Sequence, residues 1–219
     1  MRRVVIPEWL DTDSCTPAEI AASLRDLDRI NRWFGGNAAL ADILRHIARG
    51  TRRRELTLLD VASGSGGVAR AVEQSLSADG LAVQTTLVDR AASHLVNGGR
   101  SVAGDALALP FADNSFDVVA STLFVHHLEP GEVTTFAREG LRVCRVAFVV
   151  NDLIRHPVHL AMVYAGVPLF SRVTRHDSVA SVKRAYTVEE MHAAVEKAGP
   201  RRVEISRHYL FRMGVTAWK

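Results

Sequence analysis

Near the N-terminus, apolar residues recur at the three- to four-residue spacing of an amphipathic helix. The first such stretch runs from Ile20 to Ile30. It follows Thr16-Pro17-Ala18-Glu19, which offers a capping residue, a proline at the first helical position and a glutamate three residues after the cap. We expect this helix to end near Gly35-Gly36. The same spacing predicts a second helix from Asn37 to Gly50.

From residue 56 onward, short apolar runs alternate with helical segments. Continuous apolar runs of this length are typical of parallel strands that are buried on both faces. The alternation predicts a Rossmann-like, doubly wound α/β fold, with a mostly parallel seven-stranded sheet, an antiparallel last strand and an N-terminal helical lid. We expect strands at 56–62, 81–88, 101–103, 116–121, 143–150, 203–207 and 209–215, and further helices at 68–76, 91–96, 132–141 and 187–198.

The length of 219 residues suits one domain. We expect residues 1–50 to form N-terminal helices, 55–150 to form a ligand-binding core, and 151–219 to add a lid insertion and the C-terminal strands. Because ligands of doubly wound sheets bind at the carboxyl ends of the strands, the candidate chemistry should lie there.

Composition and charge narrow the range of partners. A formal net charge of +3 without aromatic interleaving argues against nucleic acid, and two cysteines without a CxxC pair suggest neither a disulfide framework nor a cysteine zinc site. The apolar stretch before Pro7 is too short for a signal peptide, and charged residues and prolines break the longest apolar run, so we expect a cytoplasmic protein without a membrane span. We expect a small-molecule partner and a monomer or homodimer.

The sequence DVASGSGG over residues 60–67 joins a buried strand to a helix through glycines. Glycine lets backbone amides approach a ligand closely, and nicotinamide proteins use such turns too. Asp60 discriminates between the ligands, because a carboxylate here would repel a pyrophosphate. S-adenosylmethionine (SAM) instead carries a cationic amino group and a cationic sulfonium, which a carboxylate attracts. The alternative role for Asp60 is a helix or turn cap.

Two further acids follow the next two strands. Asp89 ends the second strand, where an acidic side chain can bind both hydroxyls of an adenosine ribose, in NAD as well as in SAM. Asp105 follows the third strand, where a carboxylate can accept a hydrogen bond from an adenine amino group, or can simply be a surface turn acid. Three acids at three consecutive strand ends are much less likely to occur by accident than any one of them alone.

These motifs resemble those of the class I SAM-dependent methyltransferases, and specifically of the ubiquinone/menaquinone-type group. LDVASGSGG at 59–67 is similar to the family's LDxGxGxG, although Ala62 stands where a glycine is common. VDRAASHL at 88–95 resembles the ribose motif, and GDALALPFADNSFDVV at 104–119 resembles the adenine motif. The resemblance covers roughly residues 55–150.

The resemblance implies a donor site in which Gly64 and Gly66 pass close to SAM, Asp60 lies near its amino acid end, Asp89 binds the ribose and Asp105 binds the adenine. It also implies that the product S-adenosylhomocysteine binds there. The full set of cofactor-binding residues that we predict is Asp60, Ala62, Ser63, Gly64, Gly66, Asp89, Arg90, Asp105, Ala106 and Ser121.

Candidates for catalysis lie after the fourth strand, where His126 and His127 are adjacent. In related enzymes this loop lies beside the transferable methyl, so a histidine here could deprotonate a phenol at neutral pH. Adjacent histidines point in different directions, and we favour His127 as the base. Both rings could instead serve packing. We predict no metal site, because the pair lacks a third ligand at a suitable spacing.

The acceptor is expected to contact residues that follow the fifth strand. Asp152 and Arg155 stand at this strand end, and Arg155 suits a carboxylate or a polarised carbonyl. The insertion over 157–175, with Tyr164, is apolar enough to cover an aromatic or lipid-like acceptor, or to add core packing. Arg32 in the N-terminal helices is the candidate on the opposite wall.

The sequence therefore predicts methyl transfer from SAM to oxygen or carbon of a small aromatic or polyketide-like metabolite. A nicotinamide oxidoreductase is the second hypothesis; Asp60 and the absence of a Tyr-x-x-x-Lys pair after the fifth strand argue against it. A non-catalytic SAM-binding protein is the third, and the three intact acid positions argue against degeneration.

Overall fold

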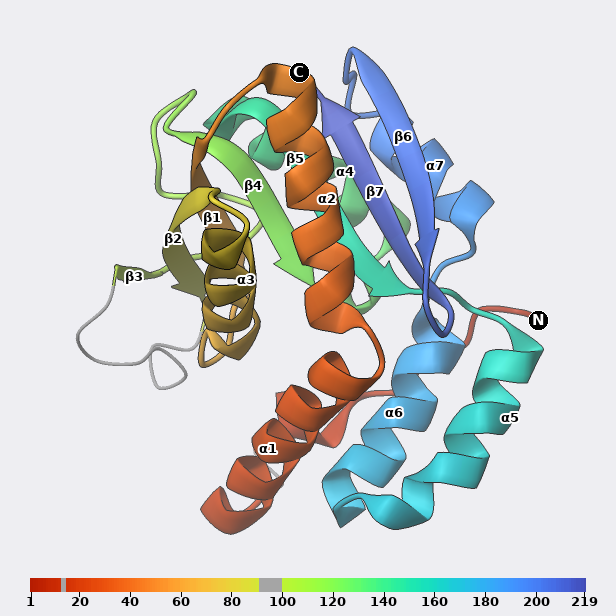
Figure 1. Ribbon diagram of the computed structural model, residues 1–219. Coiled ribbons are helices and arrows are strands. Elements are labelled where there is room, and N and C mark those ends of the chain that lie inside the picture. The colour runs from red at the N-terminus through yellow and green to blue at the C-terminus, as the bar shows by residue number, and fades with distance from the viewer. Residues whose placement is uncertain (13–14, 91–99) are drawn as a thin grey trace.

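A seven-stranded sheet forms the centre of the computed structural model, which describes residues 1–12, 15–90 and 100–219 (Figure 1). Its strands are β1 Glu55–Val61, β2 Ala82–Asp89, β3 Ser101–Ala103, β4 Phe116–Thr122, β5 Cys144–Leu153, β6 Arg202–His208 and β7 Arg212–Trp218. They lie in the order β3-β2-β1-β4-β5-β7-β6. The first five pair in parallel, and β7 runs antiparallel to both β5 and β6. The predicted doubly wound sheet with an antiparallel last strand is confirmed.

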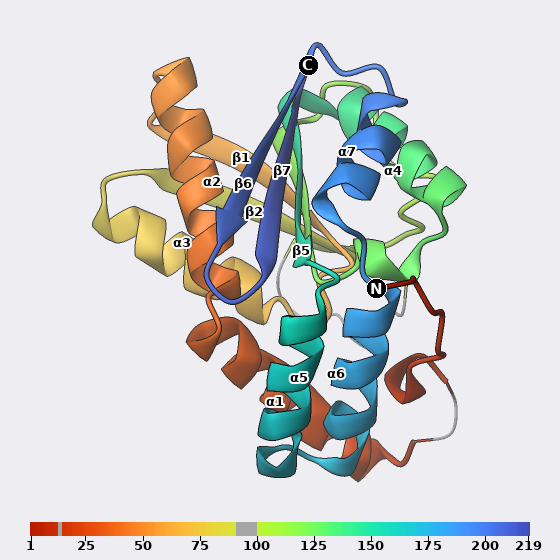
Figure 2. The ribbon, with the colours of Figure 1, turned by 90° about the vertical axis from the view of Figure 1, so that its right-hand side faces the viewer.

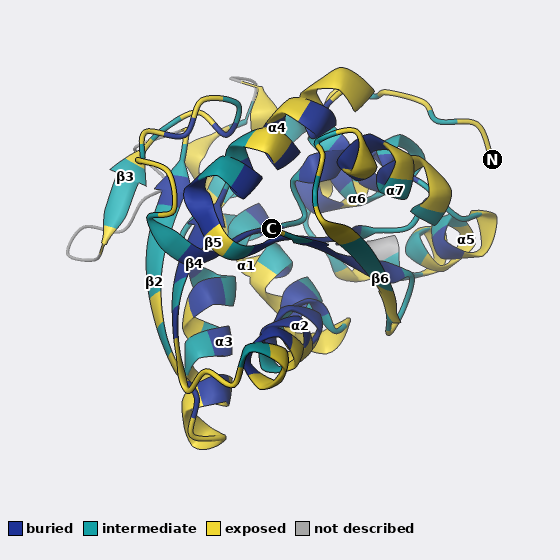
Figure 3. Ribbon diagram, turned by 90° about the horizontal axis from the view of Figure 1, so that it is seen from above, coloured by how far each residue is buried: buried dark blue, intermediate teal, exposed yellow. Residues whose placement is uncertain are grey.

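Helices cover both faces of this sheet, as the view from above shows (Figure 3). Helices α2 and α3 lie on one face, and α4 and α7 lie on the other. The helices are α1 Pro17–Trp33, α2 Gly36–Thr51, α3 Gly67–Ala78, α4 Pro130–Val143, α5 Pro157–Gly166, α6 Arg172–Arg184 and α7 Val188–Glu196, with short 3-10 helices η1 Trp9–Asp11, η3 Val125–His127 and η4 Val167–Leu169. The helix predicted at 91–96 lies outside the described residues.

Two helix starts form as their capping residues predict. The Thr16 hydroxyl accepts the Glu19 N–H at 3.3 Å, and the Glu19 carboxylate accepts the Thr16 N–H at 3.0 Å. The same reciprocal pair starts α7, between Thr187 and Glu190. Each pair satisfies backbone donors that a helix terminus would otherwise leave unbonded. Between α1 and α2, Gly35 turns the chain with a φ of 79°.

The core consists of two apolar layers, one on each face of the sheet. Leu44 and Ile47 of α2 pack against Leu58 on one face, and all three are fully buried. On the other face, the rings of Phe136 and Phe148 meet edge to face with centroids 4.9 Å apart. Burial on both faces is why the central strands have continuous apolar runs.

One strand differs from its predicted position. The sequence predicts the last strand over 209–215, whereas β7 spans Arg212–Trp218. Tyr209 follows β6, and Leu210 and Phe211 have φ values of 53° and 57°, in the left-handed region that a strand excludes. These apolar residues form the hairpin turn, so their side chains gave a strand-like signal in a segment that reverses the chain.

Helices α1, α5 and α6 lie together beyond the carboxyl ends of the parallel strands (Figures 1 and 2). Hydrogen bonds join α1 to α6: Asp26 accepts the Ser171 N–H at 2.8 Å, and Thr174 donates to Ser23 at 3.1 Å. The insertion after β5 is thus helical and covers the edge where ligands of this fold bind. Among the described residues, no helix has both the length and the apolar character to cross a membrane.

Candidate functional site

The turn between β1 and α3 brings backbone atoms close to a ligand position. Gly66 has a φ of 72°, and a Cβ on it would lie 2.6 Å from Leu87 Cδ1, so the position requires glycine. A Cβ on Gly64 would have no described atom within 4 Å. Ala62 has a φ of 57° and therefore adopts, with a side chain, the left-handed conformation that the more common glycine adopts at less cost. The turn is tight at Gly66 and open at Gly64, as a ligand cradle should be.

Two carboxylates lie beside this turn. Asp89 accepts the Gly64 N–H at 2.8 Å through Oδ2, which fixes the turn against the end of β2. Asp60 is 2% exposed, and burial together with the charge of Asp89 raises the pKa of Asp60 to about 7. Within the described residues, no basic side chain forms an ion pair with Asp60. A cation placed here would lower this pKa and would be held strongly in return.

The third acid lies on the neighbouring strand end. Asp105 is exposed, and its Oδ1 accepts the Leu107 N–H at 2.9 Å. The Gly104 N–H donates to the backbone oxygen of Asp89 at 3.1 Å, which ties this loop to the end of β2. Since β3, β2 and β1 are neighbours in the sheet, the three acids follow one another along its carboxyl edge. This order matches an elongated ligand with separate amino acid, ribose and base parts.

The other predicted donor residues line the same edge. Ser63 donates to the Val88 oxygen at 3.3 Å, Arg90 is exposed directly after Asp89, and Ala106 is buried. Ser121 is fully buried at the end of β4, and its Oγ lacks a hydrogen-bond partner in the described part of the chain. The residues therefore fit SAM: carboxylates for its cationic end and ribose, and an open glycine for its approach. Their roles stay predictions.

Each of the two histidines of η3 pairs with a carboxylate. His126 is 2% exposed, and its Nδ1 lies 2.7 Å from Oδ1 of Asp152 at the end of β5. Burial alone would lower the pKa of His126, but the charges of Asp152 and Glu8 raise it to about 10. His127 has its Nδ1 2.7 Å from Oδ2 of Asp11. Both rings are thus paired with carboxylates, and His126 is too buried to reach an acceptor directly.

The predicted acceptor residues do not converge. Asp152 binds His126 and is 1% exposed. Arg155 donates to the backbone oxygens of Met1 and Ala185, and to Glu190 at 2.6 Å, so its hydrogen bonds hold the N-terminal segment. The structure therefore does not support the prediction that Asp152 or Arg155 contacts the methyl acceptor. The remaining two, Arg32 at the end of α1 and Tyr164 on α5, are exposed on the covering helices.

Sequence reasoning missed one buried cation in this region. Arg212, at the start of β7, is 1% exposed and donates to Asn31 at 3.0 Å and to the Phe34 oxygen at 3.1 Å. Burial lowers the pKa of Arg212 to about 10, although the charge of Asp152 opposes this. Its role is to fasten the end of α1 to the sheet. A lone arginine between a turn and a strand carries no sequence signal for such a contact.

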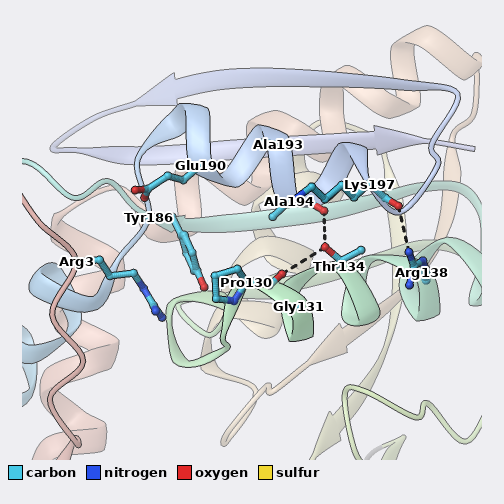
Figure 4. Close-up of a pocket in the computed structure, with 10 residues that line it drawn as sticks. All are labelled: Arg3, Pro130, Gly131, Thr134, Arg138, Tyr186, Glu190, Ala193, Ala194 and Lys197. Atoms are coloured by element: carbon cyan, nitrogen blue, oxygen red, sulfur yellow. Dashed lines mark hydrogen bonds between the residues drawn. The ribbon is translucent and has the colours of Figure 1, made fainter.

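A surface hollow of about 690 Å³ lies elsewhere, between α4 and α7 (Figure 4). Thr134 donates to the Ala194 oxygen across its floor at 2.9 Å. Its lining includes Arg3, Arg138 and Tyr186, and none of the predicted site residues. This hollow is on the outer face of the helical layer, away from the acids at the carboxyl edge, so it takes no part in the candidate site.

The central part of the chain matches a protein family. Residues 59–147 match the family model described as "Methyltransferase domain". No curated protein matches the chain by sequence.

Several solved structures share the fold. A proposed O-methyltransferase from Nostoc punctiforme PCC 73102 is 15% identical, with a TM-score of 0.62 over 100% of this chain and 64% of that one. The plantazolicin methyltransferase BpumL, in complex with a pentazolic desmethylPZN analog and S-adenosylhomocysteine, is 12% identical, with a TM-score of 0.69 over 93% of this chain and 91% of that one. The CMeT domain of the citrinin polyketide synthase is 12% identical, with a TM-score of 0.54 over 74% of this chain and 46% of that one. The chain thus spans less than two thirds of the Nostoc protein.

Proposed function

We propose that the chain transfers the methyl group of SAM to oxygen or carbon of a small aromatic or polyketide-like metabolite. The match of residues 59–147 to the model described as "Methyltransferase domain" supports this proposal. The observation that carries this proposal is the buried Asp60, which lies next to the half-buried Asp89 and the open backbone of Gly64. Asp60, buried and with a raised pKa, calls for a cation, and a nicotinamide dinucleotide would place a pyrophosphate there instead.

The carboxyl edge has a role for each part of the donor. Asp60 would hold the cationic amino acid end, Asp89 the ribose hydroxyls and Asp105 the adenine amino group. When bound, SAM supplies an electrophilic methyl group, and S-adenosylhomocysteine is the product. The chain promotes such a transfer mainly by orienting the two reactants and excluding water, which fits the position of α1, α5 and α6 over this edge.

The covering helices support an apolar acceptor. Exposed large apolar side chains gather on α1, α5, η4 and the β6–β7 turn, on the elements that surround the carboxyl edge. Apolar and aromatic walls with few polar groups are typical of small-molecule sites. The structural neighbours named for plantazolicin and for the citrinin polyketide synthase act in natural-product contexts by their names, which agrees with this acceptor class.

The base role of His127 has a structural condition. Nε2 of His127 lies 3.5 Å from Oε1 of Glu8, so the nitrogen that would take a proton faces this buried carboxylate. An acceptor could reach it only if Glu8 moved away. A carboxylate acceptor would require no base at all. We therefore keep His127 as a proposed base for phenolic or carbon acceptors alone.

Calorimetric titration with S-adenosylhomocysteine and with NADH tests the donor. We expect S-adenosylhomocysteine to bind and NADH not to bind. Asp89→Ala should weaken S-adenosylhomocysteine binding strongly, whereas Asp42→Ala, at an exposed acid that pairs with Arg45, should leave it unchanged. Binding of NADH alone would overturn the proposal. Phenols, quinones and carboxylic acids would then be screened as acceptors with labelled SAM. If none of them were methylated, the proposed acceptor class would be wrong, while the proposed SAM binding would still stand.

A further inference from the structure

A buried carboxylate lies between the two histidine rings, where the N-terminal segment meets the loop after β4. Glu8 precedes η1 and is 7% exposed. Its Oε1 lies 3.4 Å from Nε2 of His126 and 3.5 Å from Nε2 of His127. The three atoms all lie within 4.8 Å of one another. The fold therefore brings two imidazole nitrogens and one carboxylate oxygen to a single point.

The opposite side of each ring is fixed by another carboxylate. Nδ1 of His126 lies 2.7 Å from Asp152, and Nδ1 of His127 lies 2.7 Å from Asp11. A carboxylate only accepts hydrogen bonds, so Asp152 and Asp11 keep a proton on each Nδ1, and a metal ion facing Glu8 would take the place of the proton on each Nε2. Histidines that bind metals are held in this way, with the second nitrogen donating to a carboxylate.

The distances from Glu8 Oε1 to the two ring nitrogens suit a tetrahedral ion. Zinc binds nitrogen and oxygen at about 2.0–2.2 Å, so its ligand atoms stand roughly 3.3–3.6 Å apart. The two measured separations from Glu8, 3.4 and 3.5 Å, fall in this range. They are also longer than a normal hydrogen bond between nitrogen and oxygen, which is about 2.7–3.2 Å. The two Nε2 atoms are therefore at distances from Glu8 that a shared ion would also give.

The charge of the cluster also suits a divalent cation. Three carboxylates, Glu8, Asp11 and Asp152, surround the two imidazoles. If both rings were protonated, the cluster would carry a net charge of −1. Zn²⁺ with two neutral rings gives the same total, because the ion replaces two protons. The backbone oxygen of His127 accepts a hydrogen bond from Arg184, and the charge of Arg184 acts on Asp11 from the outside.

We propose that Nε2 of His126, Nε2 of His127 and Oε1 of Glu8 bind one Zn²⁺ ion, with Asp152 and Asp11 orienting the rings. Imidazole nitrogen favours zinc over magnesium or calcium. Three protein ligands leave a fourth position for water or for an oxygen of a bound ligand. The site goes beyond the proposed methyl transfer and does not depend on it.

Two consequences follow for the molecule. The ion fastens the N-terminal segment, through Glu8, to the loop after β4. It also occupies the lone pair of His127 Nε2, so His127 cannot serve as a general base while the ion is bound.

Metal counting and calorimetry test this proposal on the full chain. Protein stripped with EDTA and dialysed is titrated with Zn²⁺, and bound metal is counted by plasma mass spectrometry. We expect one zinc per chain. Glu8→Gln and His127→Ala should weaken binding at least about 100-fold, and Asp11→Asn about 10-fold, the size of effect known for groups that orient metal-bound histidines. His46→Ala is the matched control, because His46 is an exposed histidine 3.1 Å from Glu204.

Substitution with Co²⁺ gives an independent readout, since a tetrahedral site with histidine ligands produces strong visible absorption that Glu8→Gln should remove. Folded wild-type chain that takes up less than stoichiometric zinc would overturn the proposal and leave the cluster as a proton-filled ion pair. The proposal would also be overturned if Glu8→Gln and Asp11→Asn bound zinc as tightly as the His46→Ala control. If His127→Ala fails to fold, Asp11→Asn remains informative, because Asp11 is half exposed. S-adenosylhomocysteine binding, measured on the same samples, reports separately on the proposed function.

Discussion

Two regions at the carboxyl edge of the sheet each contain a buried carboxylate, and the pKa values of the two carboxylates are shifted in opposite directions. At the ends of β1 and β2, Asp60 and Asp89 lie together, and burial and mutual repulsion raise the pKa of Asp60 to about 7. At the ends of β4 and β5, Asp152 lies against His126, and although burial opposes it, this contact holds the pKa of Asp152 below its usual value. Asp60 therefore has no ion-pair partner among the described residues, whereas Asp152 has one in His126.

This difference separates an acid that lacks a cationic partner from an acid that is already paired within the fold. A buried acid with a raised pKa costs folding free energy that a cationic ligand can return, which is expected of a site for an amino-sulfonium donor. A buried acid with a paired histidine stabilises the fold before any ligand arrives. The third acid beside the histidines, Glu8, makes the second region more negative than a simple pair and gives it room for an ion.

The largest effect should come from breaking the second region. We expect His126→Ala to lower the free energy of unfolding by about 3–5 kcal/mol in EDTA, because it leaves Asp152 buried without its partner. The folded pKa of His126, about 10, lies above its ordinary 6.5, so its contribution is full below pH 6.5 and is lost as the pH rises through 10. Urea unfolding at several pH values measures this. A loss no larger than that of the exposed control His46→Ala would contradict it.

In the first region, Asp89→Ala should remove most of the donor affinity. A carboxylate that binds two ribose hydroxyls and the Gly64 N–H contributes roughly 1.5–3 kcal/mol for each charged hydrogen bond, so affinity for S-adenosylhomocysteine should fall at least about 100-fold. Calorimetry checks this, with circular dichroism to verify that the variant is folded. A change below about threefold would show that the ribose binds elsewhere.

Asp60→Asn should lower the affinity for SAM and raise the free energy of unfolding. The folded pKa of Asp60, about 7, lies above its ordinary 3.8, so the folded chain holds a proton that the unfolded chain releases, and stability falls as the pH rises between these values. The amide removes this loss, and we expect a gain of about 1–3 kcal/mol at pH 8 without ligand. SAM affinity should fall and should no longer increase with pH through 7. Thermal melts and calorimetry across pH 5.5–8.5 test both expectations. If SAM affinity depended on pH in the variant as it does in the wild type, the cationic end of SAM would lie away from Asp60.

Asp105→Ala should have a smaller effect on binding, about 10-fold, because Asp105 is exposed and would lose a single hydrogen bond to adenine. Inosine-containing S-adenosylhomocysteine, which lacks the amino group, supplies the matched test. It should bind the wild type and the variant almost equally. Strong discrimination against this analogue by the variant would assign the adenine contact to another residue.

The smallest effect should come from Ala62→Gly. Ala62 has a φ of 57°, a conformation that costs alanine about 1 kcal/mol, and glycine regains part of this while losing backbone entropy. We expect unfolding free energy to rise by about 0.5 kcal/mol with donor affinity unchanged within twofold. Lower stability in a thermal melt would show that the Ala62 methyl group is needed for packing.

The sequence alone determined the first region. Consecutive parallel strands end at the same edge of a sheet, so the spacing of Asp60, Asp89 and Asp105 after three apolar runs was enough to place them side by side. The glycine turn and the capping boxes are also local, since each depends on residues a few positions apart. The hairpin turn at Leu210 and Phe211 was missed because its apolar side chains hide a backbone conformation that no side-chain pattern encodes.

Only the tertiary structure decided the second region. Glu8 and Asp11 reach the histidines because η1 is fastened to α6, where Asp177 accepts the Trp9 N–H at 2.8 Å and the His176 ring stacks on Trp9 with centroids 4.1 Å apart. The third ligand that the spacing of the histidines lacked comes from a segment distant in sequence. A contact of this kind depends on how whole helices pack, and its energy comes from burial and charge pairing that exist only after the chain has folded.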